Sequence, residues 1–217
     1  MQSALASSIV IPAFNEETTV AEVVRVASES HLGTIYVIDD GSSDNTVQAA
    51  TRAGATVIQL PANLGKGGVL HHAAMNLAAD VLILLDADLV GLTPEHVRAL
   101  AEPVLAGEVD MTRGLFNGGR VRTSLAQHLA PQLSGQRAII RKKLAEIPDL
   151  AASRYGVEIA ITKHAKRASW RTQDVWLTGV AQVMKEEKRG FWKGFRVRLG
   201  MYADIARAYV QAHVSRK

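Results

Sequence analysis

SSIVIPAFNE at residues 7–16 decides the fold of this chain, because a short apolar run changes directly into a polar turn. Residues 7–11 have the composition of a buried strand. After the turn, apolar residues between positions 20 and 27 recur three and four apart, which is the spacing of one helix face. A strand, a polar turn and an amphipathic helix in this order predict the start of a βαβ unit.

The same alternation continues through the first half of the chain. We expect strands at 34–39, 55–60 and 81–85, and helices between 45 and 54, over 67–79 and from the Thr93-Pro94 pair to 105. Strand–helix alternation favours a parallel sheet with helices on both faces. The sequence therefore predicts an α/β fold with a Rossmann-like, mostly parallel sheet.

The pattern is looser after Gly107. A strand over 135–140 that leads into a short helix, a longer helix over 155–168 and a strand over 170–177 are expected. No internal repeat and no linker divides the chain. We therefore expect one domain over 1–217, with halves at 1–107 and 108–217.

Composition excludes several classes of protein. The 217 residues contain no cysteine, so disulfides, thiolate nucleophiles and cysteine-bound zinc are excluded. The first residues do not have the pattern of a signal peptide. No apolar run approaches the ~20 residues that span a bilayer. A cytoplasmic location, with membrane association left open, is expected.

Positive charge is concentrated near the C-terminus. Six basic residues lie between Lys185 and Arg198, where only Glu186 and Glu187 offset them. Such a cluster suits phosphate groups, a peripheral contact with an anionic membrane, or a solvated helix face. Apolar residues from Trp192 to Tyr209 follow helical spacing, which suits a membrane interface, packing on the domain or a homodimer contact. We expect no nucleic-acid partner.

Asp86 and Asp88 directly follow the apolar strand 81–85. Residues two apart in an extended segment point to the same side, so both carboxylates can face one ligand. No compensating cation lies near them in the sequence, and oxygen ligands of this kind select Mg²⁺ or Mn²⁺. The pair is expected to bind such a metal together with substrate phosphates.

Acidic residues also end the first two strands. Asp39 and Asp40 can accept hydrogen bonds from a nucleobase and a ribose, and Glu16 can join them. Their alternative roles are an Asx-turn and electrostatic support of a helix N-terminus. Lys66 stands in NLGKGG at 63–68, where glycines let the backbone approach a phosphate. That loop is not a Walker A motif, because Gly67 follows the lysine.

Six segments resemble the family-2 glycosyltransferases, in the branch that contains dolichyl-phosphate mannose synthase and glucosyl-3-phosphoglycerate synthase. They are IVIPAFNE at 9–16, VIDDGSSD at 37–44, NLGKG at 63–67, LDADL at 85–89, GQRA at 135–138 and YGVE at 155–158. The resemblance implies a GT-A fold and inverting transfer of a hexose from a nucleotide-diphosphate sugar.

The resemblance also implies roles for individual residues. Those implied to bind the nucleotide sugar are Pro12, Ala13, Phe14, Glu16, Asp39, Asp40, Lys66, Asp86, Ala87, Asp88 and Lys188. Asp88 would be the more direct metal ligand and Asp86 the second. Glu158 would be a general base or a ligand of sugar hydroxyls. Gln182 departs from the pattern, because relatives tend to carry histidine or arginine there.

The implied acceptor is phosphorylated. Gly118, Gly119, Arg120 and Thr123 resemble a phosphate grip, which favours a small phosphorylated acid such as 3-phosphoglycerate. The C-terminal stripe favours a polyprenyl phosphate instead. Two other functions stay open: a nucleotidyltransferase, which would need a glycine-rich basic loop after the first strand, and a non-catalytic nucleotide-sugar binding module, which Gln182 motivates.

Overall fold

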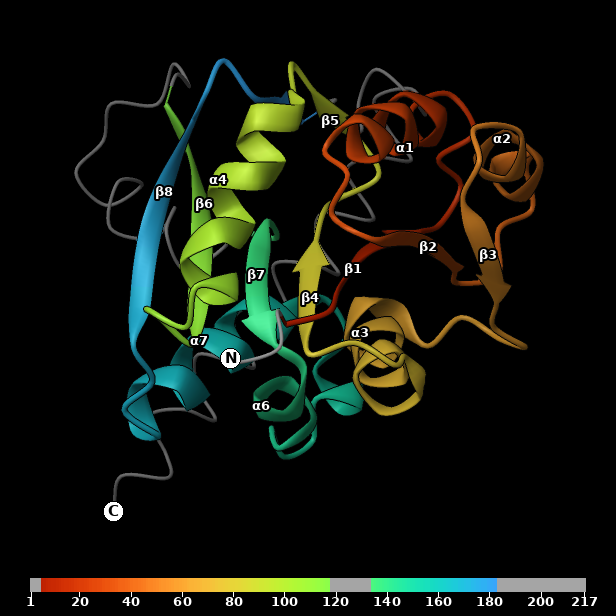
Figure 1. The fold of residues 1–217 in the computed structure, drawn as a ribbon. Helices are drawn as coiled ribbons and strands as arrows, with labels where there is room; N and C mark the ends of the chain where they lie inside the picture. The colour runs from red at the N-terminus through yellow and green to blue at the C-terminus, as the bar shows by residue number, and fades with distance from the viewer. Residues whose placement is uncertain (1–4, 118–133, 183–217) are drawn as a thin grey trace.

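The computed structural model describes residues 5–117 and 134–182. In this part of the chain, a seven-stranded sheet has the order β3-β2-β1-β4-β7-β6-β8 (Figure 1). Its strands are β1 (Ser7–Ala13), β2 (Thr34–Asp39), β3 (Thr56–Gln59), β4 (Val81–Leu84), β6 (Met111–Asn117), β7 (Arg137–Ile140) and β8 (Thr172–Thr178). The helices are α1 (Val20–Glu29), α2 (Thr46–Arg52), α3 (Gly65–Asn76), α4 (Pro94–Leu105), α6 (Arg141–Ala145) and α7 (Val157–Arg167), with a 3-10 helix, η1 (Ala151–Gly156), before α7.

The sheet is mostly parallel. β1 pairs in parallel with β2 and β4, β2 with β3, and β6 with β8. β7 is antiparallel to both of its neighbours, β4 and β6. Among the seven strands of this sheet β7 alone therefore runs in the opposite direction, so the expected mostly parallel α/β sheet is confirmed.

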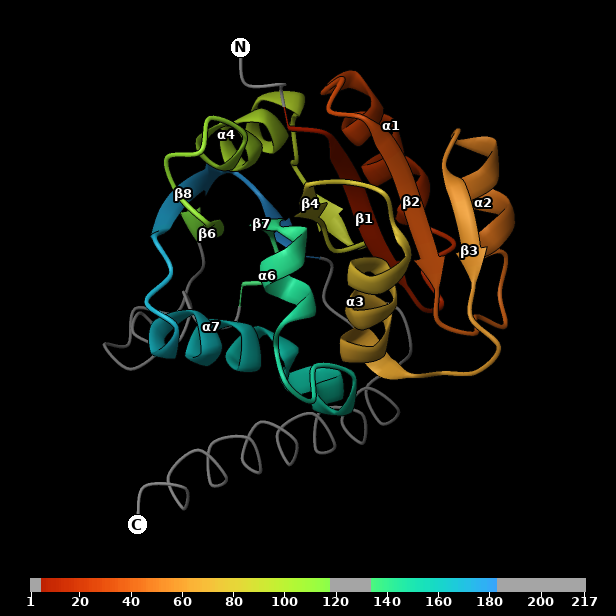
Figure 2. The same cartoon turned by 60° about the horizontal axis from the view of Figure 1, so that its bottom comes forward.

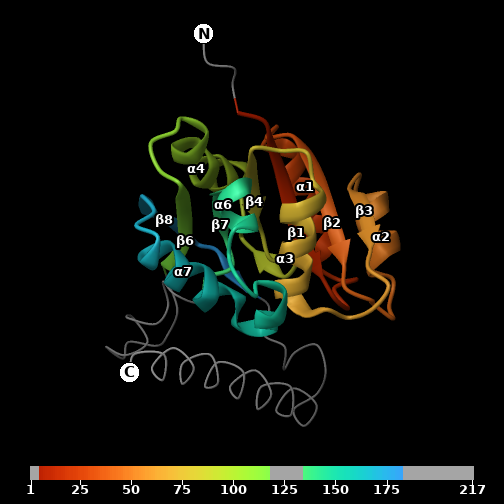
Figure 3. The ribbon, with the colours of Figure 1, turned by 90° about the horizontal axis from the view of Figure 1, so that it is seen from below.

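Two apolar clusters cover the two faces of the sheet. On one face, α1 and α4 pack their valines and leucines against Ile9, Ile11 and Ile83. On the other face, α3, α6 and α7 pack against Val10, Leu82 and the neighbouring strand residues. Figures 2 and 3 show the two helix layers with the sheet between them. Because side chains alternate between faces, β4 must be apolar at every position, and all four of its residues are buried.

Most predicted elements are confirmed, with shifted ends in several cases. The strand 34–39 and the helix from Pro94 to Leu105 have the predicted bounds, and Thr93 caps that helix by accepting the His96 N–H. The helix expected over 67–79 begins at Gly65 and ends at Asn76. Strand β6 was not predicted, because Arg113 and Gly114 interrupt its apolar pattern. Glycine makes room for Leu177 at this position, since a Cβ at position 114 would lie 2.6 Å from Leu177 Cδ1 and would force that side chain to move.

A second, two-stranded sheet lies beside the end of β4. β5 (Leu89–Val90) pairs antiparallel with β9 (Ala181–Gln182), so that Leu89 lies opposite Gln182. This pairing brings residues that are far apart in the sequence next to the Asp86–Asp88 segment. Among the described helices, none has the length and apolar character needed to cross a membrane.

Gly33 and Gly54 form a matched pair for testing backbone constraints, because both have φ of +96°. A Cβ at Gly33 would lie 2.1 Å from the Ser7 carbonyl oxygen, whereas a Cβ at Gly54 meets nothing within 4 Å. Gly54→Ala should therefore cost only the left-handed conformation, about 1–2 kcal/mol. Gly33→Ala should cost about 1–3 kcal/mol more, because the β1–β2 junction must also move. Urea unfolding of both variants measures the difference, and equal losses would contradict the close packing.

Candidate active site

The carboxyl ends of β1, β2 and β4 lie side by side at one edge of the sheet. Ala13 pairs with Asp39, the Asp40 N–H donates to the Ala13 carbonyl oxygen at 2.9 Å, and the Leu85 N–H donates to Val10 at 3.0 Å. Ligands of open α/β sheets bind at such an edge. Near the end of β1, Pro12 is half-buried and Ala13 is buried, whereas Phe14 is 38% exposed.

The turn after β1 is tied to the turn after β2. Asn15 has a left-handed backbone (φ 56°), its N–H donates to Ser42 Oγ at 2.8 Å, and its Oδ1 accepts the Ser43 N–H at 2.8 Å. The Glu16 N–H donates to Thr46 Oγ1 at 2.7 Å, and Glu16 Oε2 accepts from Thr19 Oγ1. These bonds hold the polar segments of the two turns as one unit.

Asp40 caps helix α3 from a different segment of the chain. Its two carboxylate oxygens accept the N–H groups of Leu64 at 2.7 Å and Gly65 at 2.8 Å. The side chain of Leu64, at the N-cap position, makes no capping bond. Burial raises the pKa of Asp40, although the two N–H groups oppose that change. The carboxylate proposed for the nucleoside therefore also fixes the start of the helix that carries Lys66.

Asp39 is 3% exposed and has one carboxylate oxygen in use. Its Oδ2 accepts the Ser42 N–H at 3.1 Å. Its Oδ1 is buried and has no hydrogen-bond donor within the described part of the chain. Since buried carboxylate oxygens are rarely left without a donor, this atom can accept a hydrogen bond from a bound ligand, from water or from a residue outside the described ranges.

The Lys66 ammonium lies between two carboxylates. It is 2.5 Å from Asp86 Oδ1 and 2.7 Å from Glu158 Oε1, and the three side chains are between 13% and 18% exposed. Burial disfavours the ammonium, but Asp86 and Glu158 outweigh that effect and raise the pKa of Lys66. The premise that no cation compensates the Asp86–Asp88 pair is thus wrong in three dimensions, because Lys66 compensates Asp86 from the helix before β4.

The second carboxylate oxygen of Asp86 accepts hydrogen bonds from two side-chain amides. Gln136 Nε2 donates to Asp86 Oδ2 at 2.8 Å, and Gln182 Nε2 donates to the same oxygen at 2.5 Å. Gln136 is completely buried at the approach to β7 and was not predicted as a site residue. The feature of the sequence that could have indicated this role is a polar residue close before the apolar residues of a strand. Gln182, noted as a departure from the family pattern, is thus a donor to Asp86 here.

Gly135 gives the Lys66–Asp86 pair the room that it needs. A Cβ at position 135 would lie 2.5 Å from both Asp86 Oδ2 and Lys66 Nζ. Any side chain there would displace the ion pair. The glycine of the GQRA segment is therefore explained by close packing against the site.

The donor set suits a metal that keeps most of its ligands from outside the protein. Asp88 is half-buried next to the occupied Asp86, with the buried Ala87 between them. Within residues 5–117 and 134–182, no group of three or more histidine, aspartate or glutamate residues could hold a metal ion. Mg²⁺ and Mn²⁺ often take only one or two carboxylates and complete their shell with phosphate oxygens and water. The residues fit such an ion at Asp88, with Asp86 available if it exchanges partners.

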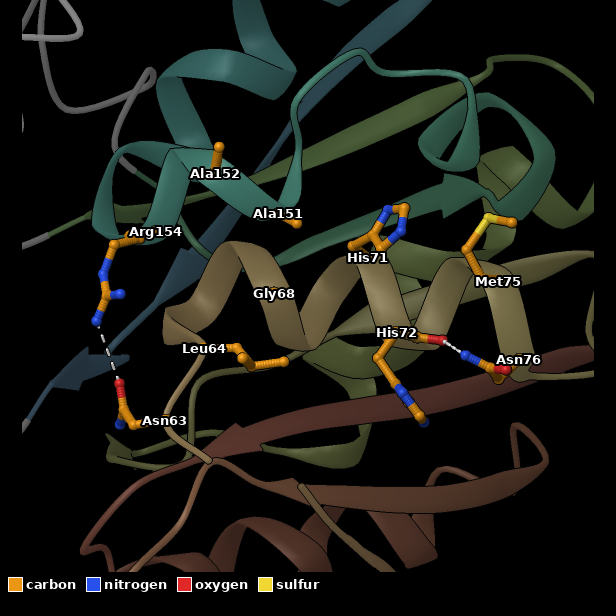
Figure 4. Close-up of a pocket in the computed structure, with 10 residues that line it drawn as sticks. All are labelled: Asn63, Leu64, Gly68, His71, His72, Met75, Asn76, Ala151, Ala152 and Arg154. Atoms are coloured by element: carbon orange, nitrogen blue, oxygen red, sulfur yellow. Dashed lines mark hydrogen bonds between the residues drawn. The ribbon is translucent and has the colours of Figure 1, made fainter. Parts of the chain in front are cut away.

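A groove of about 360 Å³ runs along the outer face of α3. Figure 4 shows Asn63 and Arg154 at one end, where Arg154 Nη2 donates to Asn63 Oδ1, and Met75 and Asn76 at the other. His71 and His72 are half-buried in its wall, in agreement with a surface role. The groove contains neither Asp86 nor Glu158, so it is separate from the acidic site.

Several residues predicted from the sequence lie outside the described residues. They are Lys188, Gly118, Gly119, Arg120 and Thr123, together with the basic cluster and apolar stripe of the C-terminal segment. The predicted site residues that the structure does bring together are Lys66, Asp86 and Glu158. Asp39, Asp40, Glu16 and Asp88 lie on the turns around them.

A mostly parallel α/β sheet with acidic groups and a lysine at its carboxyl edge is the arrangement of the open α/β proteins that bind ligands at that edge. Residues 8–161 match the protein family described as Glycosyl transferase family 2. The chain therefore belongs to glycosyl transferase family 2, as its sequence motifs predicted.

Several relatives of this chain share one name. Glucosyl-3-phosphoglycerate synthase of Mycobacterium tuberculosis is 31% identical over 192 residues, which cover 71% of this chain and 59% of that protein. The Mycolicibacterium smegmatis protein of the same name is 31% identical over 189 residues, covering 71% of this chain and 62% of the relative. The chain thus spans about three fifths of the length of these relatives.

Solved structures carry the same fold. The crystal structure of the Mycobacterium tuberculosis enzyme with Mn²⁺, UDP and phosphoglyceric acid has a TM-score of 0.71 and 29% identity, over 83% of this chain and 72% of that one. Its complex with Mn²⁺, UDP and glucosyl-3-phosphoglycerate has a TM-score of 0.78 and 26% identity, over 97% and 80%. The predicted GT-A fold is confirmed.

Lys66→Met should destabilise the folded chain by about 3 kcal/mol or more, because two buried carboxylates lose their common cation. Adding Glu158→Gln to that variant should recover part of the loss, since one unpaired charge is removed. Lys142→Met, at an exposed lysine of α6, is the control and should change stability by less than about 0.5 kcal/mol. Denaturant unfolding gives these values, and a Lys66→Met variant as stable as the control would contradict the charge arrangement.

Proposed function

We propose that this chain is an inverting hexosyltransferase that moves a sugar from a nucleotide-diphosphate sugar to a phosphorylated acceptor. The observation that carries the proposal is the Lys66 ammonium between Asp86 and Glu158, beside Asp88, at the carboxyl edge of a family-2 sheet. These groups offer a cation to a diphosphate, an oxygen ligand to a metal and a carboxylate to a reacting hydroxyl.

The proposed reaction forms one bond and breaks another. The acceptor hydroxyl oxygen attacks the anomeric carbon, while the bond from that carbon to the β-phosphate oxygen breaks. The nucleoside diphosphate leaves with additional negative charge, which Lys66 can stabilise. The hydroxyl proton goes to the Glu158 carboxylate.

Lys66 and Glu158 cannot perform these roles while they remain paired. A carboxylate bound to an ammonium is a weaker base, and an ammonium bound to two carboxylates is less available to a phosphate. The proposal therefore assigns Lys66 to the donor's diphosphate when the donor is bound, which leaves Glu158 available to the acceptor hydroxyl. A role of Glu158 as a ligand of sugar hydroxyls remains the alternative.

The metal we propose is Mg²⁺ or Mn²⁺, held by Asp88 and by the donor's phosphates. Crystal structures of the Mycobacterium tuberculosis glucosyl-3-phosphoglycerate synthase hold Mn²⁺ or Mg²⁺ together with UDP, which supports this assignment. When bound, such an ion would neutralise the charge of the leaving diphosphate. Asp86 would contribute only by giving up one of its donors.

A small phosphorylated acid is the acceptor that we favour over a polyprenyl phosphate. The relatives that support this choice are named glucosyl-3-phosphoglycerate synthase, and solved relatives contain phosphoglyceric acid. The direct test incubates the protein with UDP-, GDP- or dTDP-sugars, Mn²⁺ and either 3-phosphoglycerate or a polyprenyl phosphate. Released nucleoside diphosphate and a new glycoside support the proposal. Donor binding without turnover would indicate a non-catalytic binding module.

Asp88→Ala should abolish the metal-dependent part of donor binding, because it removes the most direct metal ligand. Asp86→Asn should weaken that binding less, since its oxygens are already occupied by Lys66 and the two amides. Glu108→Ala, at an exposed acid after α4, should leave binding unchanged. Calorimetry with UDP in the presence and absence of Mn²⁺ measures all three. Normal metal-dependent binding by Asp88→Ala would refute the metal assignment.

Asp39→Asn should weaken binding of UDP by roughly 1–3 kcal/mol, if the free Oδ1 accepts the N3–H of uracil. Cytosine has a lone pair at that position, so the unmodified protein should prefer UDP to CDP and the variant should lose that preference. Competition of both nucleotides in one binding assay provides the internal control. A variant that keeps the full preference for UDP would show that Asp39 does not bind the base.

A further inference from the structure

We propose that Arg137 is the positioning residue of this site and that its guanidinium keeps the Glu158 carboxylate in contact with Lys66. The inference rests on the proposed function and goes beyond it by assigning a role to a side chain that touches neither metal nor donor. Arg137 is the first residue of β7 and is only 1% exposed. It directly follows Gln136, which donates to Asp86.

The guanidinium joins three segments of the chain. Its Nε donates to the Ser134 carbonyl oxygen at 3.0 Å, before β7, and its Nη1 lies 3.5 Å from Met111 Sδ on β6. Its Nη2 donates to the Glu158 carbonyl oxygen at 3.2 Å and to Thr162 Oγ1 at 3.0 Å, both on α7. One planar group therefore fixes the first turn of α7 relative to β6 and to the segment before β7, which contains Gln136.

Side chains from inside and outside α7 bind its first turn. Its N-cap residue is Gly156, and no side chain caps the helix. Thr162 Oγ1 also donates to the Glu158 carbonyl oxygen at 2.8 Å, so Arg137 and Thr162 together hold the backbone that carries the Glu158 side chain. A change in that backbone would move the Glu158 carboxylate away from Lys66.

Charge balance points to the same residue. Lys66 provides one positive charge against the two negative charges of Asp86 and Glu158. Burial lowers the pKa of Arg137 to about 10, with Glu158 favouring and Arg113 opposing the charged form, so the guanidinium remains protonated at neutral pH. A buried cation is often less favourable than an apolar side chain of the same volume. The charges of Glu158 and Asp86 both favour its charged form, which supports a role in the site over one in packing alone.

The test compares Arg137→Lys with Arg141→Lys. Arg141 is a matched control, because its Nε and Nη1 also bind backbone carbonyls, those of Ala79 and Ala74, away from the acidic site. Arg137→Lys keeps the positive charge but cannot make all the hydrogen bonds of the planar guanidinium. Glu158 should therefore be displaced, which should lower kcat about 10- to 100-fold. The donor KM should stay within about twofold, as uniform binding is unchanged. Arg141→Lys should change kcat by no more than about twofold.

A double-mutant cycle separates positioning from general damage. If Arg137 acts through Glu158, the variant Arg137→Lys with Glu158→Gln should be no slower than Glu158→Gln alone. Losses that multiply, or a kcat unchanged by Arg137→Lys, would overturn the inference. If Arg137→Lys does not fold, Thr162→Val removes one partner of the guanidinium without changing charge. It should lower kcat in the same non-additive way, and an unchanged kcat would count against the inference.

Hydrogen exchange keeps the inference testable if the chain transfers no sugar. Arg137→Lys should accelerate amide exchange in residues 157–162 and leave α3 unchanged, whereas Arg141→Lys should not accelerate exchange in residues 157–162. Absence of turnover with every donor and acceptor would refute the proposed function alone. Unchanged exchange in the first turn of α7 would refute the role of Arg137 alone.

Discussion

The ion pair between Lys66 and Asp86 determines how the rest of the site can be built. An ammonium 2.5 Å from a carboxylate at the end of β4 requires the first turn of α3 to lie directly over that strand end. Gly135 has no side chain because a Cβ would overlap this pair. Gly67 permits a different close contact, because a Cβ there would lie 2.5 Å from the Leu150 carbonyl oxygen, directly before η1. Gly135 thus makes room for the two charges, and Gly67 makes room for the packing of α3 against η1.

The same ion pair depends on segments that are far apart in the sequence. Asp40, directly after β2, fixes the N-terminus of α3. That helix carries Lys66, whose ammonium balances the charge of Asp86 after β4. Glu158 joins from α7, on a segment that follows η1, which packs against α3. The site thus needs the complete α/β layer on one face of the sheet. Neither half of the chain, taken at 1–107 and 108–217, contains it alone.

How much of this the sequence reveals depends on the distance between the interacting residues. The strand 34–39 and the helix from Pro94 to Leu105 follow from local periodicity and capping, and both were predicted with the observed bounds. The contact of Lys66 with Glu158 joins residues 92 positions apart, and no local pattern encodes it. The sequence therefore indicated two uncompensated carboxylates, where the fold places a cation on one of them. The GQRA segment contains Arg137, but the sequence predicted no role for this residue, because its partners lie on β6 and α7.

Gln182 shows how a departure from a family pattern acquires a physical meaning in the fold. A glutamine carries no charge, so by sequence it weakened the case for a typical phosphate site. In the structure its amide donates to Asp86 Oδ2, the oxygen that Gln136 also contacts, while Lys66 occupies Oδ1. Asp86 then has donors at both oxygens, and a metal ion gains little access to it without displacing one of them. This occupancy supports the proposed roles of the two aspartates, in which Asp86 organises the protein and Asp88 would bind the metal.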